Sequence, residues 1–116
     1  MVVDDNESLR KFTALLLEKQ GFDVIQKEDG EQALEALSSE SIDLILMDIE
    51  MPVMDGIETS RKIRSSKCPY STIPIIAHTG DSSPVTLEKI ESSGMSDFIV
   101  KPADKARLFD KIAHWI

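Results

Sequence analysis

The sequence has a single cysteine, few aromatic residues and no apolar run long enough to span a membrane. The lone cysteine, Cys68, excludes an internal disulfide and agrees with a reducing compartment. It has no histidine or second cysteine near it in the sequence, so we interpret it as a loop residue rather than a nucleophile or metal ligand. The N-terminus does not resemble a signal peptide. These absences predict a cytoplasmic domain that does not insert into a membrane.

Basic residues are scarce relative to acidic ones. The chain carries 21 acidic and 13 basic residues, for a formal net charge of −8, and the basic residues are scattered singly. Nucleic-acid binding requires a basic surface that displaces counterions from phosphates, so direct nucleic-acid binding is not expected. The acidic balance instead favours solubility, metal cations or a basic partner. At 116 residues the chain is predicted to form one domain over residues 1–116.

The apolar residues that are present occur in short runs of strand length. Residues 44–47 form a continuous apolar run that ends at Asp48 and breaks at Pro52, which is typical of a strand buried on both faces of a parallel sheet. Similar runs predict strands at 1–3, 23–27, 73–79 and 98–100, alternating with helices. This alternation favours the α/β class, and within it a flavodoxin-like, doubly wound, five-stranded parallel sheet of order 2-1-3-4-5 with five helices in three layers.

Caps and apolar spacing set the expected helices. The first helix is predicted to follow a cap at Asp5 or Asn6 and to end at Gly21. Its apolar residues at helical spacing are Leu9, Phe12 and Leu16. Further helices are predicted over residues 30–37, 57–63 and 84–92, and a last helix carries a stripe of Leu108, Ile112 and Trp115. The first strand is short, as expected if the chain begins part-way through it.

Polar side chains follow the predicted strands at one end. Asp4 and Asp5 come after the first strand, Asp48 ends the third, and Thr79 and Lys101 end the fourth and fifth. Because the carboxyl ends of parallel strands meet at one edge of a sheet, we expect these groups to converge. Clustered carboxylates repel one another and raise one another's pKa unless a cation is present.

A magnesium ion would relieve that repulsion, because Mg²⁺ takes one or two carboxylates and keeps several waters. We expect Asp5 and Asp48 to be direct ligands, Asp4 to bond to metal-bound water, and the backbone carbonyl of Glu50 to fill a further position. Transition metals are disfavoured, since no histidine or cysteine belongs to the set.

The same groups suit phosphoryl transfer. Asp48 would attack phosphorus as the nucleophile, the Lys101 ammonium and Mg²⁺ would neutralise the phosphoryl oxygens, and Thr79 would donate its hydroxyl to one of them. No Ser-His-Asp arrangement and no glycine-rich phosphate loop is present. We interpret His78 as a residue at the rim of the site and His114 as a surface helix residue.

Four segments resemble the response-regulator receiver domain of two-component signalling, the family of the chemotaxis receivers. They are Asp4-Asp5-Asn6 and residues 46–56, 73–79 and 98–102, and in order and spacing they cover essentially the whole chain. The resemblance implies phosphorylation of Asp48 by a histidine kinase or histidine phosphotransfer protein. It also implies Mg²⁺ at Asp5 and Asp48 with help from Asp4, Mn²⁺ as a substitute, and a cis bond between Lys101 and Pro102.

By the same resemblance, Thr79 and Phe98 form a switch pair. Phosphorylation would draw Thr79 toward the phosphoryl group, and Phe98 would move inward to fill the space it leaves. This movement would change a partner-binding face formed by the fourth helix, the fifth strand and the last helix. A receiver of this kind catalyses its own phosphorylation and dephosphorylation and does not turn over a small-molecule substrate.

Residues 94–102, with Trp115 near the end, are most similar to receivers of hybrid sensor histidine kinases. The expectation is therefore a domain from the cytoplasmic part of a membrane-bound hybrid kinase, a free-standing receiver, or a fragment of a larger regulator whose output domain has been removed. The cognate kinase, the output, the lifetime of the phosphoryl group and the oligomeric state are left open by the sequence.

Some residues depart from the family pattern. The switch aromatic is Phe98 rather than tyrosine, so no phenolic hydrogen bond marks the active state. Glu50 and Asp81 are acidic at the two positions that tune loss of the phosphoryl group to water, and the sign of their effect stays open.

Three alternative functions are weighed against a phosphorylated receiver. The first is a pseudo-receiver, a binding module that is never phosphorylated, although all five site residues are present. A haloacid-dehalogenase-like phosphatase is the second, but Glu50 stands where that family has an aspartate and a cap insertion is lacking. A flavin-binding flavodoxin is the weakest, because the first strand leads into acids.

Overall fold

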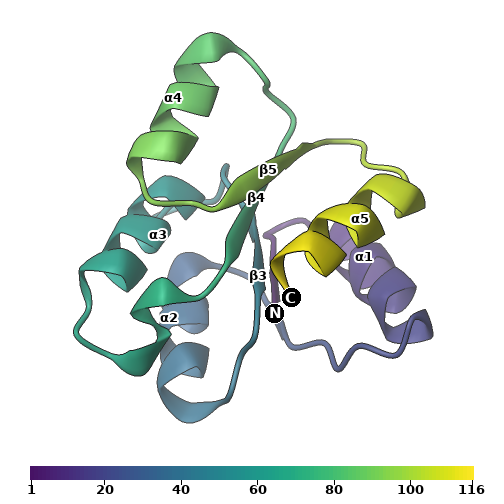
Figure 1. The fold of residues 1–116 in the computed structure, drawn as a ribbon, viewed down its shortest axis with the longest axis horizontal. Coiled ribbons are helices and arrows are strands. Elements are labelled where there is room, and N and C mark those ends of the chain that lie inside the picture. Colours follow the sequence, from purple (N-terminus) through teal and green to yellow (C-terminus); the bar gives the residue numbers. More distant parts are fainter.

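The apolar runs of the sequence form one parallel sheet, and the computed structural model describes all 116 residues (Figure 1). The strands are β1 (Val2–Val3), β2 (Gln26–Lys27), β3 (Ile45–Asp48), β4 (Ile75–Thr79) and β5 (Asp97–Val100). The helices are α1 (Glu7–Lys19), α2 (Gly30–Ser39), α3 (Gly56–Ser65), α4 (Pro84–Ser92) and α5 (Lys105–Trp115). The strand order β2-β1-β3-β4-β5, with all pairs parallel, confirms the predicted topology.

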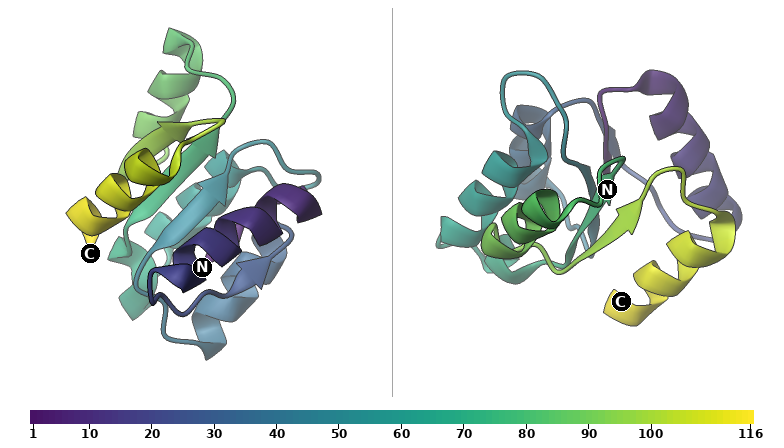
Figure 2. Two further views of the ribbon diagram at one scale, coloured as in Figure 1. Left: turned by 90° about the vertical axis from the view of Figure 1, so that its right-hand side faces the viewer. Right: turned by 90° about the horizontal axis from the view of Figure 1, so that it is seen from above.

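Helices cover both faces of the sheet, α1 and α5 on one and α2, α3 and α4 on the other (Figures 1 and 2). Strand alternation divides the core accordingly, because successive side chains point to opposite faces. Leu46 and Ile76 pack with Leu17, Leu108 and Ile112 from α1 and α5. The other core cluster joins the intervening strand residues to the α2–α4 side and includes Ile45, Met47, Ile75, Ala77, Leu37, Ile63 and Ile90. This two-sided burial explains why the central strands are continuously apolar.

Each α-helix begins at a side-chain cap, which accepts a hydrogen bond from a backbone N–H of the first turn. Asn6 caps α1 by accepting from the N–H of Leu9 at 3.0 Å. Asp55 caps α3 by accepting from the N–H of Glu58 at 2.8 Å. The remaining caps are Asp29, Ser83 and Asp104. The cap at Asp55 sets where α3 begins after β3, close to the edge at which Asp48 ends.

The inner face of α1 differs from the sequence prediction. Phe12 is 58% exposed, and Leu9 and Leu16 are only half-buried. The buried residues of α1 are Arg10, Thr13, Ala14 and Leu17. The buried face is therefore rotated from the one that hydrophobicity alone favours, and on it Arg10 turns inward and donates from Nη1 to the carbonyl of Asp4 at 2.9 Å.

Several boundaries also differ. The edge strand β2 covers only residues 26–27, which pair with Val2 and Val3 of β1. The helices α2 and α3 run two residues beyond their predicted ends, and an unpredicted 3₁₀ turn, Pro69–Thr72, precedes β4. No helix combines the length and apolar character needed to cross a membrane.

The interpretation of His78 as a residue at the rim of the site is wrong. His78 is a residue of β4, pairs in register with Asp48 and is 6% exposed. The reason is alternation along β4, which turns position 78 to the same face as Ile76, beneath α1 and α5. Burial, and secondarily the positive charge of Lys101, lower the pKa of His78 to about 4.

Candidate functional site

The polar residues at the strand ends meet at one edge of the sheet. Asp4 and Asp5 follow β1, and Asp48 is the last residue of β3. Each of these three residues has a carboxylate oxygen within 4.8 Å of the oxygens offered by the other two. The convergence has a topological cause, since β1 and β3 are adjacent parallel strands that end at the same level.

Lys101 completes the cluster from the loop after β5. Its Nζ lies 3.1 Å from Oδ1 of Asp48 and 3.4 Å from Oδ2 of Asp4. Both carboxylates are buried, with Asp4 2% and Asp48 4% exposed, whereas Asp5 is exposed. One ammonium therefore faces a group of three carboxylates, and the cluster has an excess of negative charge.

The electrostatics of Asp48 follow from this arrangement. Burial is the main cause that raises the pKa of Asp48 well above its ordinary value, and repulsion from Asp4 adds to it. The hydrogen bond and charge of Lys101 act in the opposite direction without cancelling the effect. A cation bound beside these groups would favour the ionised form of Asp48 that can act as a nucleophile.

The loop after β3 is held tightly against the strand end. The N–H of Gly56 donates to the carbonyl of Ile49 at 2.9 Å, and the N–H of Glu50 donates to Oδ1 of Asp48 at 3.3 Å. A Cβ at position 56 would collide with the backbone carbonyl of Asp48 and would lie 3.0 Å from Cα of Ile49. Glycine is therefore needed where α3 begins, and the side chain of Glu50 stays exposed beside the site.

The turn that carries the first two acids is fixed from two sides. The N–H of Asn6 donates to Oδ1 of Asp4 at 2.9 Å, and Arg10 Nη1 donates to the Asp4 carbonyl. Arg10 is 6% exposed and forms no ion pair, and its Nε has no hydrogen-bond partner. Sequence reasoning missed Arg10, and its helical spacing with Thr13, Ala14 and Leu17 was the only available signal.

Thr79 lies at the end of β4, 2% exposed. Its hydroxyl donates to the carbonyl of Asp81 at 3.0 Å and accepts from the N–H of Asp81 at 3.0 Å. The hydroxyl is thus bonded within its own loop rather than to the acidic cluster. The carbonyl of Thr79 accepts from the N–H of Lys101 at 2.6 Å, which ties the two strand ends together. The Lys101–Pro102 peptide bond is cis.

Phe98 lies on the edge strand β5, in register with Ala77 of β4. The residue is half-buried and packs against the core cluster on the α2–α4 side of the sheet. Nζ of Lys111, from α5, lies 5.9 Å from the centroid of the Phe98 ring. Phe98 therefore sits at the boundary between the core and the surface that α4, β5 and α5 share.

The residues present fit a hard divalent cation. The cluster offers carboxylate oxygens only, close enough together to share one ion, and two of its three members are buried. Mg²⁺ prefers oxygen donors of this kind, whereas zinc and copper sites draw on histidine or cysteine. The negative charge that Lys101 leaves uncompensated supplies the attraction.

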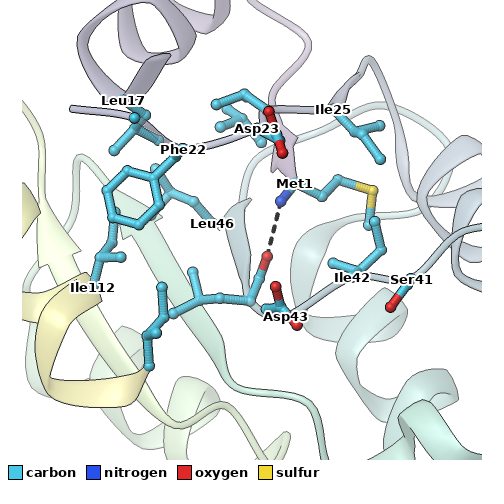
Figure 3. A pocket seen from close by; sticks show the side chains of 15 residues that line it. Met1, Leu17, Phe22, Asp23, Ile25, Ser41, Ile42, Asp43, Leu46 and Ile112 are labelled. Carbon is cyan, nitrogen blue, oxygen red and sulfur yellow. Dashed lines mark hydrogen bonds between the residues drawn. The ribbon is translucent and has the colours of Figure 1, made fainter. Parts of the chain in front are cut away.

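An apolar pocket of about 410 Å³ lies elsewhere in the fold, and its lining includes neither the acidic cluster nor Lys101, Thr79 or Phe98. Its walls include residues that precede β1 and β3, so it opens at the opposite edge of the sheet. Figure 3 shows the Met1 ammonium in this pocket, where it donates to the carbonyl of Leu44 at 2.8 Å. Burial lowers the pKa of this ammonium to about 6. The pocket lacks the convergent polar groups of the acidic edge.

Comparison with known proteins agrees with the site. Residues 1–113 match the family model described as the response regulator receiver domain. The chain is 55% identical over 116 residues to the CAI-1 autoinducer sensor kinase/phosphatase CqsS of Vibrio cholerae, covering 100% of this chain and 17% of that protein. Hybrid histidine kinases of Dictyostelium discoideum are also similar. The chain thus spans less than a fifth of the length of the sensor kinases it matches.

Two solved structures are similar throughout. The chemotaxis protein CheY4 of Vibrio cholerae aligns with a TM-score of 0.93 at 29% identity, covering 99% of this chain and 95% of that one. The receiver domain of a sensor histidine kinase from Pseudomonas aeruginosa aligns with a TM-score of 0.90 at 32% identity, covering 98% and 93% of the two chains. That crystal structure has a magnesium ion coordinated in its active-site cleft.

Proposed function

Since this chain belongs to the response regulator receiver domain family, we propose that it accepts a phosphoryl group on Asp48 from a phosphohistidine donor. The observation that carries the proposal is the placement of Asp48 at the end of β3, buried, beside two further acids and 3.1 Å from the ammonium of Lys101. A strand-end carboxylate in such surroundings is held in one position, which favours attack on an incoming phosphorus atom.

In the proposed reaction, a carboxylate oxygen of Asp48 forms a bond to phosphorus while the bond from phosphorus to the donor imidazole nitrogen breaks. The electron pair of that bond leaves with the imidazole. Lys101 already contacts Asp48, so its ammonium is placed to neutralise charge on the phosphoryl oxygens as the bond forms. Asp4 and Asp5 would repel the phosphoryl group unless their charge is compensated.

We assign that compensation to Mg²⁺, with Asp5 and Asp48 as direct ligands, Asp4 reached through water and the Glu50 carbonyl as a further ligand; Mn²⁺ is the proposed substitute. When bound, the ion supplies positive charge that offsets the carboxylates and the phosphoryl oxygens. The oxygen-only donor set supports this assignment, as does the magnesium in the similar Pseudomonas aeruginosa receiver.

We propose Thr79 and Phe98 as the switch. In the structure the Thr79 hydroxyl bonds to the backbone of Asp81, and phosphorylation would redirect it to a phosphoryl oxygen. Phe98, one strand away and in register with Ala77, would then move toward the space that Thr79 leaves. This movement would alter the surface shared by α4, β5 and α5.

The proposed partners are a histidine kinase or a histidine phosphotransfer protein, with the domain on the cytoplasmic side. The similarity to receivers within sensor kinases supports this choice. The family assignment removes the phosphatase and flavodoxin alternatives. A pseudo-receiver remains the competing hypothesis, because the presence of the site residues does not establish their use.

The deciding experiment is intact-mass measurement after incubation with acetyl phosphate, with and without Mg²⁺, for the wild-type protein and for Asp48→Asn. One added phosphoryl group that requires both Mg²⁺ and Asp48 is expected. Beryllofluoride, which mimics the acyl phosphate, provides the second arm and detects a site whose phosphoryl group is lost too quickly to observe. If the protein gains no phosphoryl group and beryllofluoride leaves the resonances of Thr79 and Phe98 unchanged, the pseudo-receiver is favoured.

A further inference from the structure

A cluster of side chains beside Phe98 joins β5 to α5. Asp97 precedes Phe98 on the strand, and Lys111 and Trp115 lie one turn apart on the helix. Oδ1 of Asp97 accepts from Lys111 Nζ at 2.9 Å, and Oδ2 accepts from Trp115 Nε1 at 3.0 Å. The N–H of Phe98 donates to the same Oδ1 at 2.8 Å. Both oxygens of one carboxylate are therefore engaged.

These contacts leave the Asp97 carboxylate little freedom. Burial acts to raise the pKa of Asp97, but the hydrogen bonds from Trp115, Lys111 and the Phe98 N–H outweigh it and leave the pKa below its ordinary value. The ionised carboxylate is therefore a stable anchor. It fixes the end of the Lys111 side chain, which would otherwise move freely at a surface position.

The anchored ammonium also faces an aromatic ring. Asp97 and Phe98 are successive strand residues, so their side chains point to opposite faces of the sheet. Because β5 is the edge strand, Lys111 reaches round it, and its Nζ lies 5.9 Å from the Phe98 centroid. That distance is within the range of cation–π attraction. Lys111 thus contacts both the anchor and the ring.

We propose that Lys111, anchored by Asp97, is a positioning residue that holds Phe98 in the half-buried arrangement of this structure and opposes its further inward movement on phosphorylation. The inference rests on the proposed function and deepens it. Phe98 has no hydroxyl, so its ring cannot gain a hydrogen bond in either arrangement. The contact with Lys111 is therefore the polar interaction that distinguishes the present arrangement of the ring from the inward one. Inward movement of the ring loses this contact, while Asp97 and Trp115 keep Lys111 in place.

The expected bias is modest. A cation–π contact at a surface position corresponds to about a two- to fivefold change in an equilibrium constant. Removing it should make the inward arrangement easier to reach and tighten the binding of any ligand that selects that arrangement by the same factor.

The same helix provides a matched control. Nζ of Lys105 lies 5.8 Å from the centroid of the Phe109 ring, and Lys105 forms no ion pair. Lys105→Met therefore removes one positive charge and one cation–π contact from α5 without touching Phe98. Loss of a positive charge by itself would weaken the binding of anionic beryllofluoride. The tighter binding expected for Lys111→Met is opposite in sign to this charge effect.

The experiment is a titration of the full chain with beryllofluoride in the presence of Mg²⁺. The single tryptophan gives one indole N–H resonance, and Trp115 donates that proton to Asp97, so its chemical shift reports directly on the cluster. Lys111→Met should bind beryllofluoride about two- to fivefold more tightly than the wild-type protein and Lys105→Met. In the free protein, Phe98 ring resonances should move in Lys111→Met and stay in place in Lys105→Met.

The titration distinguishes failure of the proposed function from failure of the proposed role of Lys111. A wild-type protein that does not respond to beryllofluoride would overturn the proposed function and this inference with it. A wild-type response with equal affinities for the two variants would overturn only the role of Lys111. If Lys111→Met does not fold, Lys111→Gln tests the same contact, because it removes the same positive charge but keeps a side chain that can hydrogen-bond to Asp97, and it should tighten binding in the same direction.

Discussion

The ammonium of Lys101 lies 3.1 Å from Oδ1 of Asp48, although 53 residues separate the two in the sequence. The contact exists because both residues stand at the carboxyl ends of parallel strands, separated in the sheet by β4. Lys101 also reaches Asp4 at 3.4 Å, so one cation serves two buried acids. The relationship makes the site sensitive both to added cations and to small movements of the strand ends.

Magnesium should stabilise the folded chain. A ligand that binds only the native state adds RT ln(1 + [L]/Kd), or about 1.4 kcal/mol at ten times Kd. Thermal unfolding with increasing Mg²⁺ should show this rise for the wild-type protein and little of it for Asp5→Asn. Asp23→Asn removes another exposed carboxylate and should keep the wild-type response. An unchanged response in Asp5→Asn would remove Asp5 from the ligand set.

Gly56→Ala should disturb the phosphoacceptor strand. The added methyl group meets the backbone of Asp48 and Ile49, which cannot rotate away as a side chain would. Overpacking of this kind costs about 2 kcal/mol, and we expect slower phosphorylation of Asp48 as its carbonyl shifts. Denaturant unfolding and intact mass measure the two effects. Gly80→Ala is the control, because a Cβ there meets no atom within 4 Å.

Val53→Asn should stabilise the protein. Val53 has a φ of 68° and is 97% exposed, so a β-branched residue occupies the left-handed region without any packing in return. Asparagine tolerates this region, and the expected gain in the free energy of unfolding is about 1 kcal/mol. Val53→Ala retains a Cβ and should gain less. A loss of stability in Val53→Asn would show that the valine side chain makes a contribution we have not identified.

His78 should make a destabilising contribution in mild acid, opposed over the same pH range by Asp48, whose raised pKa of about 7 makes the native state take up a proton. The native state keeps the buried His78 side chain neutral, with a pKa of about 4, whereas the unfolded chain takes up the proton near 6.5. At His78 the unfolded state therefore binds more protons between these values, and the contribution of His78 to the free energy of unfolding decreases as the pH falls from 6.5 to 4, by up to about 3 kcal/mol. At higher pH the contribution of His78 is constant.

His78→Leu should remove this contribution, since it removes the titrating group and its unpartnered Nε2. On acidification from pH 7 to pH 4, the free energy of unfolding of His78→Leu should therefore rise relative to that of the wild-type protein. Urea unfolding from pH 4 to pH 7, without divalent cations, measures the slope. The exposed His114 supplies the control, and His114→Gln should keep the wild-type slope. A slope in His78→Leu equal to that of the wild-type protein would show that His78 does not contribute to the pH dependence.

Much of the fold followed from local patterns. Apolar runs of strand length, separated by capped helices, predicted the parallel sheet and its order, and the structure and its relatives confirm both. The convergence of Asp4, Asp5, Asp48 and Lys101 was predictable for the same reason, because strand ends can be read from the sequence and parallel strands end together. The cap at Asn6, one of the two residues predicted for it, likewise followed from local chemistry.

The sequence by itself thus determined the elements, their order and the edge at which the acids gather, since each depends on periodicity and on residues close together in the chain. Only the tertiary structure decided which face a polar side chain takes. Arg10 turns inward to the Asp4 carbonyl while Phe12 is exposed, and His78 is buried because α1 and α5 cover the face of β4 that it shares with Ile76. The Asp97, Lys111 and Trp115 cluster likewise depends on how α5 packs against β5. Such contacts depend on how whole helices and strands pack against one another, which local sequence patterns do not predict.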